Sequence, residues 1–519
     1  MRATFHLKTL SVAVAALSVA SLASAAGLDR SGQDITAFLQ DGTYAETVYT
    51  YISADVSGHD NAYVGSDDKA YTQGKKIDDI AESYDFFRYG VKTDINDTFS
   101  VGVLYDEPFG ASAAYSGNNN FVAQGDVNAA INAISNGAAG SPAEAGGVIT
   151  ALTNGATAAG AEAQSLAAQA GAAAAAGNLQ QASDLQAQAQ AKVAEAETFA
   201  GQARSVGAAV AAAQAELATQ GEATEVEVRS HSLTAILGMK LGENKNFQIY
   251  GGPVAQRIQS ETKLRGLAYG PATGYTSNSN PDMDYGYIAG IAYSKPEIAL
   301  KAALTYRSEI DHDIDISENY PIAGILAQGA ALQQGATPAQ AAAIGAAAAN
   351  RNSNYEITTP KSVNFDFQTG INPTTLATAK VRWVPWGDFA IVPPLYNEVS
   401  KTNAAYGPDG LALVDYEDDQ WQVELGLAKR LSPALAVSGT VGWDSGAGNP
   451  VTSLGPIEGY YSAGLGAKYN ITENWAVSAG GKYLWFGDAK GVLPTGKIVA
   501  DFEDNDGYVL GAKISYQSK

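Results

Sequence analysis

The sequence of 519 residues contains no cysteine and only four histidines. Disulfide frameworks, cysteine nucleophiles and thiolate metal sites are therefore excluded. A Gly-x-Ser-x-Gly nucleophile elbow and a phosphate-binding loop are also missing. We expect a protein that is not an enzyme and that uses no cofactor and no metal.

Basic residues are in short supply as well: Lys and Arg number 32 against 54 Asp and Glu, which gives a formal net charge of -22 at pH 7. Duplex nucleic acids need a basic face on the protein that binds them. A nucleic-acid partner is therefore excluded.

Long apolar runs are confined to the start of the chain. Met1 to Ala25 has a basic beginning, an apolar centre and a small-residue end, which predicts a secretory signal segment over 1–25. Without Arg2 and Lys8, 30 basic residues face 54 acidic ones, a charge of about -24. Beyond residue 25 no run could form a membrane helix, so a membrane protein would have to be a β-barrel.

The sequence does contain segments in which apolar or aromatic residues alternate with small or polar residues. Between Trp475 and Trp485, apolar and aromatic residues share one face and small or polar residues the other, with aromatics at both ends. The same pattern recurs in 461–469 and 508–516. A β-sandwich alternates too, but aromatics at both strand ends are typical of a membrane girdle.

This alternation predicts fourteen strands and an all-β, antiparallel transmembrane β-barrel over 43–519. The expected strands are 43–57, 82–95, 98–108, 224–242, 245–261, 283–295, 297–313, 354–370, 374–388, 417–430, 433–445, 457–470, 473–487 and 505–517. Tight turns alternate with long loops, as in barrels of the bacterial outer membrane. We therefore expect residence in the outer membrane, in contact with its lipid and lipopolysaccharide, and chain ends in the periplasm.

Two expected outer loops hold Ala-rich inserts, at 121–222 and 321–350. Their Ala, Gln and Glu content favours helix. The insert is either a solvated decoration or a helical hairpin that shields the barrel mouth or contacts a neighbour. Its Gly and polar interruptions argue against a long coiled coil.

Several stretches resemble the FadL family of outer-membrane transporters of long-chain fatty acids and other hydrophobic compounds. They are Ile95-Asn96-Asp97, Phe99-Ser100-Val101, 104–110, 381–389 and 464–470. The resemblance implies a fourteen-stranded barrel with a small N-terminal hatch at 26–42 and a kinked third strand that opens the wall sideways. The hatch of this chain lacks the Asn-Pro-Ala that members often show.

The third strand carries the first group of candidate site residues. They are Asp106, Glu107, Pro108, Phe109 and Gly110. Because Pro removes a ladder donor and Gly loosens the backbone, pairing should fail here and create a lateral exit. The alternative is a simple strand end.

Two further groups concern the ligand. In the hatch, Ile35, Phe38 and Leu39 either line the pocket for the ligand's tail or pack the plug. Strand parity predicts lumenal cations that could bind a carboxylate, among them Arg229, Arg307, Lys380 and Arg382. Most lumenal cations should instead neutralise lumenal acids. Parity also places His231 in the lumen, where it could not pair with a serine on the outer face as a barrel phospholipase requires.

The function expected from the resemblance is passive uptake of hydrophobic molecules, above all long-chain fatty acids, with exit through the barrel wall. Uptake of other hydrophobics such as aromatic hydrocarbons is the nearest alternative. A surface or adhesive protein, with the Ala-rich loop as its working part, is another. A general porin is disfavoured because the segment before Thr43 is long enough to plug the lumen.

Overall fold

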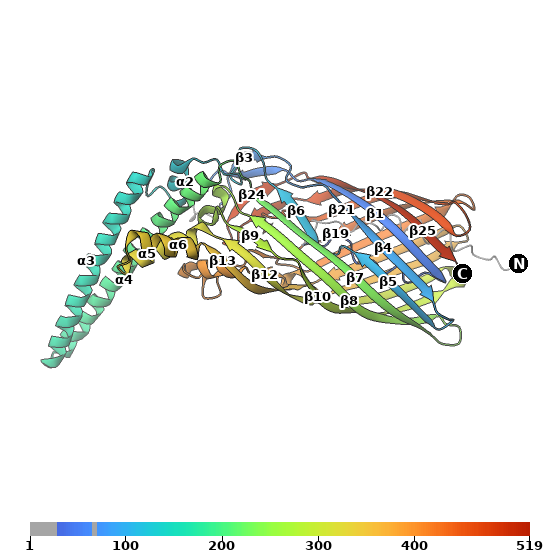
Figure 1. Cartoon of the computed structure of the whole chain (residues 1–519), viewed down its shortest axis with the longest axis horizontal. Helices are drawn as coiled ribbons and strands as arrows, with labels where there is room; N and C mark the ends of the chain where they lie inside the picture. Colours follow the sequence, from blue (N-terminus) through green and yellow to red (C-terminus); the bar gives the residue numbers. More distant parts are fainter. Residues whose placement is uncertain (1–27, 65–69, 519) are drawn as a thin grey trace.

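The computed structural model describes residues 28–64 and 70–518, so the predicted signal segment and the first two residues of the predicted hatch lie outside the described part. Within it, an antiparallel sheet closes into a barrel of fourteen strands (Figure 1). Closure occurs because β1 (Thr43–Asp55) pairs with both β4 (Tyr84–Asp94) and β25 (Asp506–Ser518). The predicted fold class and strand number are confirmed.

The other wall strands follow the chain order. They are β5 (Phe99–Asp106) with β6 (Gly110–Ala114), β7 (Glu225–Leu241), β8 (Phe247–Lys263), β10 (Asp282–Lys295), β11 (Leu300–Arg307) with β12 (Ile310–Asn319), β13 (Asn350–Thr359) with β14 (Ser362–Asn372), β15 (Thr375–Val384), β18 (Gln420–Arg430), β19 (Leu435–Asp444), β21 (Glu458–Asn470) and β22 (Trp475–Gly487). The third, seventh and eighth strands are thus each divided. The short β9 (Thr276–Ser279) pairs with β8 and β12.

The outer surface of the barrel carries an apolar band between aromatic residues, as the alternation predicts. Leu465, in the middle of the band, is 75% exposed, and the aromatic side chains of Trp475 and Trp485 are exposed at the two ends of β22. A continuous band of large apolar side chains on the surface of a protein is stable where the surface faces lipid and not water. The chain is therefore a multi-pass transmembrane barrel of the outer-membrane type.

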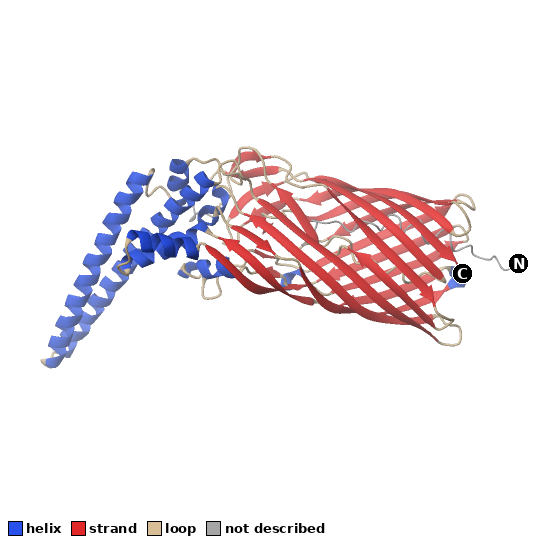
Figure 2. Cartoon of the chain, in the orientation of Figure 1, coloured by secondary structure: helices blue, strands red, loops and turns tan. Residues whose placement is uncertain are grey.

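Most helices lie at the end of the barrel opposite to the C-terminus of the chain (Figure 2). They are α2 (Val127–Ile134), α3 (Pro142–Ala175), α4 (Leu179–Ala218), α5 (Pro321–Gln333), α6 (Pro338–Ala348) and α7 (Pro394–Ser400), together with the 3-10 turns η2 (Leu267–Ala272), η4 (Trp386–Asp388) and η5 (Ala404–Tyr406) of the loops on that side. A further 3-10 turn, η3 (Pro296–Ile298), lies at the other end, in the turn between β10 and β11. No helix in the described part of the chain combines the length and the apolar character that crossing a membrane requires.

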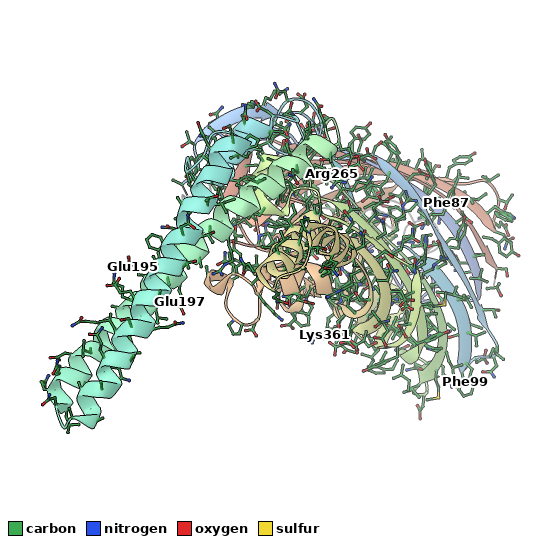
Figure 3. All side chains as sticks on the ribbon, turned by 60° about the vertical axis from the view of Figure 1, so that its left-hand side comes forward. Phe87, Phe99, Glu195, Glu197, Arg265 and Lys361 are labelled. Carbon is green, nitrogen blue, oxygen red and sulfur yellow. The ribbon has the colours of Figure 1, made fainter. Side chains whose placement is uncertain are left out.

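Helices α3 and α4 pack side by side and project from the barrel as an arm (Figures 1 and 3). The predicted helical content is confirmed, and α3 and α4 form a helical hairpin, one of the two arrangements expected for this insert. Gly155 faces the Phe199 ring, where an added Cβ would lie 3.2 Å from that ring. The glycine therefore makes room for a large side chain of the partner helix. Lys192 bridges Glu162 and Glu195 across and along the arm.

Outer loops fold inward over the barrel mouth in two small sheets. One joins β20 (Val451–Thr452), β23 (Ala489–Val492), β24 (Ile498–Phe502), β2 (Gly58–Asn61) and β3 (Gln73–Ile77), and the other joins β16 (Ala390–Ile391) and β17 (Val414–Asp415). Their apolar residues form a large buried cluster in the outer half of the lumen. The lumen is therefore filled rather than open.

A second apolar cluster is built on the hatch. Ile35, Phe38 and Leu39 are buried against the wall residues Leu104 and Ile236. Lys92 donates to the backbone carbonyls of Gln40 (2.7 Å) and Gly42 (3.0 Å), which ties the end of the hatch to β4. The described residues 28–42 of the predicted hatch thus lie inside the barrel, packed against its wall.

Candidate functional site

The ladder of the wall is interrupted at the third strand. β5 pairs with both of its neighbours, β4 and β7, whereas β6 pairs with β7 and reaches the other side only through the bridge between Ala81 and Ala113. Pro108, which has no N–H to donate, lies at the break. Because the strand resumes as β6, residues 106–110 form a kink inside the wall rather than a strand end.

The first described residues of the hatch close this break from inside. The backbone N–H of Arg30 donates to the carbonyl of Pro108, and that of Gly110 donates to the carbonyl of Leu28, both at 2.8 Å. Asp29 and Phe109 face each other between these bonds. An added Cβ at Gly110 would lie 2.3 Å from Cζ of Arg30, so only glycine leaves room for this guanidinium. The hatch therefore substitutes for the missing neighbour strand.

Outside the break lies a groove with a free volume of about 460 Å³. Its lining consists of Arg30, Glu82, Ser83, Tyr84, Asp85, Glu107, Ser112, Ala113, Ala114, Glu225, Val226, Glu227, Arg229, His231 and Glu261. Arg30 stacks on the Tyr84 ring at 4.0 Å and lies 3.9 Å from Glu107. The next outward residue of β7 after His231, Leu233, is 51% exposed. The groove therefore lies at the outer edge of the apolar band.

Two residues of this groove were predicted to lie in the lumen, and this prediction was wrong. The side chain of Arg229 is 58% exposed and pairs with Glu227 on the outer surface. His231 faces outward too, with Nδ1 2.8 Å from the hydroxyl of Tyr105. The 17 residues of β7 exceed the 9–11 that a membrane strand needs. Its outer part rises above the apolar band, where polar residues also occupy the outward face.

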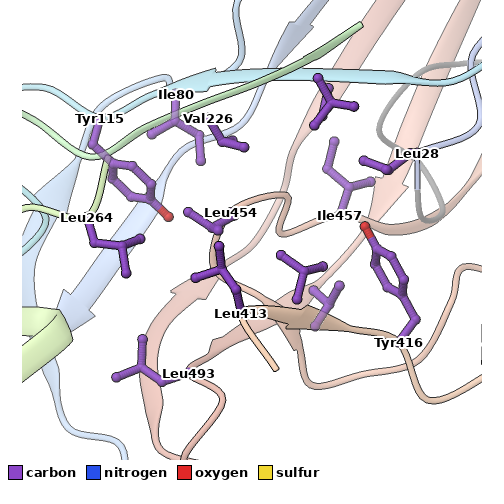
Figure 4. Close-up of a cluster of buried hydrophobic side chains, with 14 of the residues drawn as sticks. Leu28, Ile80, Tyr115, Val226, Leu264, Leu413, Tyr416, Leu454, Ile457 and Leu493 are labelled. Atoms are coloured by element: carbon purple, nitrogen blue, oxygen red, sulfur yellow. The ribbon is translucent and has the colours of Figure 1, made fainter. Parts of the chain in front are cut away.

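Behind the kink lies an apolar pocket. Some of its lining side chains, such as Leu28, Leu413 and Leu454, belong to the buried cluster drawn in Figure 4. It is lined by Leu28, Ala111, Val226, Val228, Ser260, Thr262, Ser277, Tyr355, Ile391, Pro393, Leu413, Val414, Tyr416, Thr452, Leu454 and Gly455. Its free volume is only about 30 Å³, so it is nearly closed and an occupant must displace side chains. Leu413 and Leu454 come from loops and not from the strands of the wall.

A charged layer lies between this pocket and the hatch cluster. Arg382 holds Asp29 with two bonds, Nε to Oδ2 at 2.7 Å and Nη2 to Oδ1 at 2.9 Å. Lys380 lies 3.0 Å and Arg88 3.5 Å from Asp34. Burial raises the pKa of Asp34, but these two cations outweigh it and hold the pKa below its usual value. The hatch is therefore fastened to β15 and β4 by buried ion pairs.

The four basic residues predicted to bind a ligand carboxylate have different surroundings in the structure. Lys380 and Arg382 are bound to hatch acids, and Arg229 lies outside the barrel. Arg307 is buried and donates through Nη1 to Thr234 Oγ1 at 3.1 Å, while its Nε and Nη2 have no hydrogen-bond partner in the described part of the chain. Of the four candidates, Arg307 therefore has donors to spare.

The predicted tail residues Ile35, Phe38 and Leu39 do not line the apolar pocket, whose inner end is formed by Leu28. They stay a prediction, with packing of the plug as their observed role. Sequence reasoning missed the pocket because its floor and roof come from loops. It also missed the hatch acids Asp29 and Asp34, although two acids inside a predicted plug indicate partners among the lumenal cations.

No family model matches the sequence, and no curated protein sequence matches it. The fold, in contrast, is shared with a solved structure of a Pseudomonas aeruginosa FadL homologue, at 13% identity over 96% of this chain and 97% of that one, with a TM-score of 0.58. The chain has the FadL fold. The resemblance noted in the sequence is thus confirmed for the architecture.

Two toluene transporters are similar at lower scores. TodX of Pseudomonas putida is 9% identical over 95% of each chain, with a TM-score of 0.46. TbuX of Ralstonia pickettii is 8% identical over 92% of this chain and 90% of its own, with a TM-score of 0.43. Scores at this level add nothing to the FadL-like fold already established.

Proposed function

We propose that this FadL-like barrel takes up hydrophobic molecules passively across the outer membrane, without a catalytic step. One observation carries the proposal: an apolar pocket in the lumen and a groove on the outer wall are separated only by β6 and the residues 28–31. Leu28 lines the pocket and Arg30 the groove. Withdrawal of residues 28–31 would open the break in the wall at 106–110, beside β6, as the path between the two spaces.

The charged layer favours this lateral route over passage along the barrel axis. An apolar chain that moved toward the periplasm would have to separate the pairs of Asp29 with Arg382 and of Asp34 with Lys380. Separating a buried ion pair costs about 3–5 kcal/mol. Transfer of the chain into periplasmic water would cost about 0.8 kcal/mol for each CH₂. Sideways release into lipid would leave the pair of Asp34 with Lys380 in place and would avoid transfer into water, so that only the pair of Asp29 with Arg382 would have to separate.

Long-chain fatty acids are the ligands that we favour within this class. Arg307 is buried with unpartnered donors, and a carboxylate supplies the acceptors that such donors need. Aromatic hydrocarbons, the alternative, match the apolar lining of the pocket but offer no acceptor to Arg307. The arm formed by α3 and α4 favours a further surface role, and its deletion would separate that role from uptake.

Replacing Arg307 with Met is expected to weaken oleate binding to the purified barrel at least about tenfold, because one charge-assisted hydrogen bond contributes about 1.5–3 kcal/mol. Toluene binding should stay unchanged. Arg307→Lys, which keeps the charge, should retain part of the affinity. Arg257→Met, on the exposed face of β8, is the matched control.

Native mass spectrometry of the wild-type barrel and of each variant, with oleate and with toluene, measures these affinities. Equal loss for oleate and toluene would mean that Arg307 only shapes the lumen, and unchanged oleate affinity would remove it as the carboxylate site. Uptake of labelled oleate by cells that carry the barrel tests the proposed transport itself. Uptake no faster than in cells without the barrel would contradict it.

A further inference from the structure

A second interruption of the wall lies between β10 and β12. β10 pairs with β11 only from Ile288 onward, while β12 pairs with β13 and β9. Two backbone hydrogen bonds lie at the two ends of this interval. The N–H of Ser308 donates to the carbonyl of Tyr287 at 3.0 Å, and the N–H of Asn280 donates to the carbonyl of Asp315 at 2.8 Å. Between these bonds β10 and β12 lie side by side without ladder pairing in the described structure.

Three side chains with metal-binding chemistry converge in this interval. They are Asp282 and Asp284 of β10 and His312 of β12, whose ligand atoms lie within 4.8 Å of one another. His312 Nδ1 is 3.5 Å from Oδ2 of Asp282 and 4.0 Å from Oδ2 of Asp284. The two strands that lack a ladder thus contribute to one cluster.

The histidine is prepared as a ligand by its other nitrogen. His312 is fully buried, and its Nε2 lies 3.1 Å from Oε1 of Gln256, which also accepts from Thr359 Oγ1 at 2.7 Å. An amide oxygen can only accept, so Nε2 carries the proton and Nδ1 presents its lone pair. This arrangement orients metal-binding histidines in other proteins.

The lone pair then points at acceptors. Nδ1 of His312 and Oδ2 of Asp282 are both buried without a hydrogen-bond partner in the described structure. A cation bound between the lone pair and the carboxylates would satisfy both atoms. One nitrogen and two carboxylate oxygens suit a divalent first-row transition metal, whereas Ca²⁺ and Mg²⁺ prefer oxygen alone.

We propose that Asp282, Asp284 and His312 bind a divalent transition-metal ion such as Zn²⁺, which clasps β10 to β12 where the ladder between them is missing. The ion would take the place of the missing backbone bonds. Gln256 acts as the positioning residue, because it fixes the protonated nitrogen of His312. The proposal is independent of the ligand that passes through the lumen.

Titration of Zn²⁺ into the full-length, EDTA-treated barrel in detergent at pH 7.5 tests the site. We expect one ion for each chain with a dissociation constant of about 10 μM or lower, and a higher melting temperature, since an ion that binds the folded state stabilises it. His312→Gln and Asp284→Asn should each weaken binding at least tenfold. Gln256→Leu should weaken it about 10–100-fold.

Asp313→Asn is the matched control, because Asp313 is an exposed acid of the same strand outside the cluster. Co²⁺ gives a second readout, since its visible spectrum reports nitrogen coordination and should lose that signature in His312→Gln. Folding of each variant is checked by its heat-modifiable migration. A folded wild-type barrel with no Zn²⁺ binding below 1 mM would overturn the proposal, as would Zn²⁺ or Ca²⁺ binding that Asp284→Asn and His312→Gln leave unchanged.

Discussion

A disulfide between cysteines introduced at Ala81 and Ala113 is expected to lower uptake of a hydrophobic ligand at least tenfold. These two residues form the bridge between the outer part of the kinked strand and the segment that precedes β4. Backbone hydrogen bonds from Glu82 to Ser112 and from Ala114 to Ile80 flank the pair, so Ala81 and Ala113 lie directly opposite each other. A disulfide can span this geometry. The crosslink would stop the break in the wall from widening.

The chain has no other cysteine, so the pair forms in a clean background. A crosslink at Ala467 and Ala479, which face each other across the intact ladder of β21 and β22, is the matched control and should leave uptake unchanged. A reducing agent should restore uptake in the first variant. Full uptake with the Ala81 to Ala113 disulfide confirmed by mass spectrometry would refute lateral exit at the kink.

Replacing Leu413 and Leu454 together with Asn is expected to weaken binding of a long-chain ligand by about two orders of magnitude or more. Each side chain lines the apolar pocket and is buried. A leucine that meets an acyl chain contributes about 1.5–3 kcal/mol, and each 1.4 kcal/mol is a factor of ten in affinity. Leu332→Asn, at an exposed leucine of α5, is the control for loop substitutions. Unchanged affinity in the double variant would show that the pocket is not the binding site.

Substitution of the hatch residues tests whether they contact the ligand or only pack inside the barrel. If Ile35, Phe38 and Leu39 contact the tail, replacing all three with Ser should weaken binding at least tenfold. If they only pack the plug, ion conductance in planar bilayers should rise while affinity stays the same. A variant with unchanged affinity and unchanged conductance would contradict the assignment of this segment as a hatch.

The barrel could be predicted from the sequence because lipid enforces a regular pattern. Lipid-facing residues such as Leu465 and Leu510 must be apolar at every second position, and aromatics such as Trp485 mark the ends of the band. The prediction of which side chains face the lumen was wrong where a strand extends beyond the membrane. Above the apolar band the pattern of β7 is reversed: Val226 and Val228 face the apolar lumen and the outward residues are polar. Parity therefore placed Arg229 and His231 on the wrong face.

The site was harder to predict because it is built across long distances in the chain. Phe109 and Gly110 could be identified from the break that Pro108 makes, but the partner of this break, residues 28–31, follows from tertiary contact alone. Leu413 and Leu454 reach the pocket from loops with no periodicity. Asp34 determines which lumenal cations are free, and only the structure shows that it binds Lys380 and Arg88 and leaves Arg307 with spare donors.

Photolabelling gives the most direct test of the claim that a hydrophobic ligand occupies the lumenal pocket. The barrel, reconstituted in lipid, is irradiated with a long-chain fatty acid that carries a diazirine near its methyl end, and the labelled peptides are mapped with and without excess unlabelled oleate. We expect label that oleate displaces in 411–416 and 452–455, the loops that line the pocket. Label confined to lipid-facing residues such as Leu465 and Leu510, and insensitive to oleate, would contradict the account.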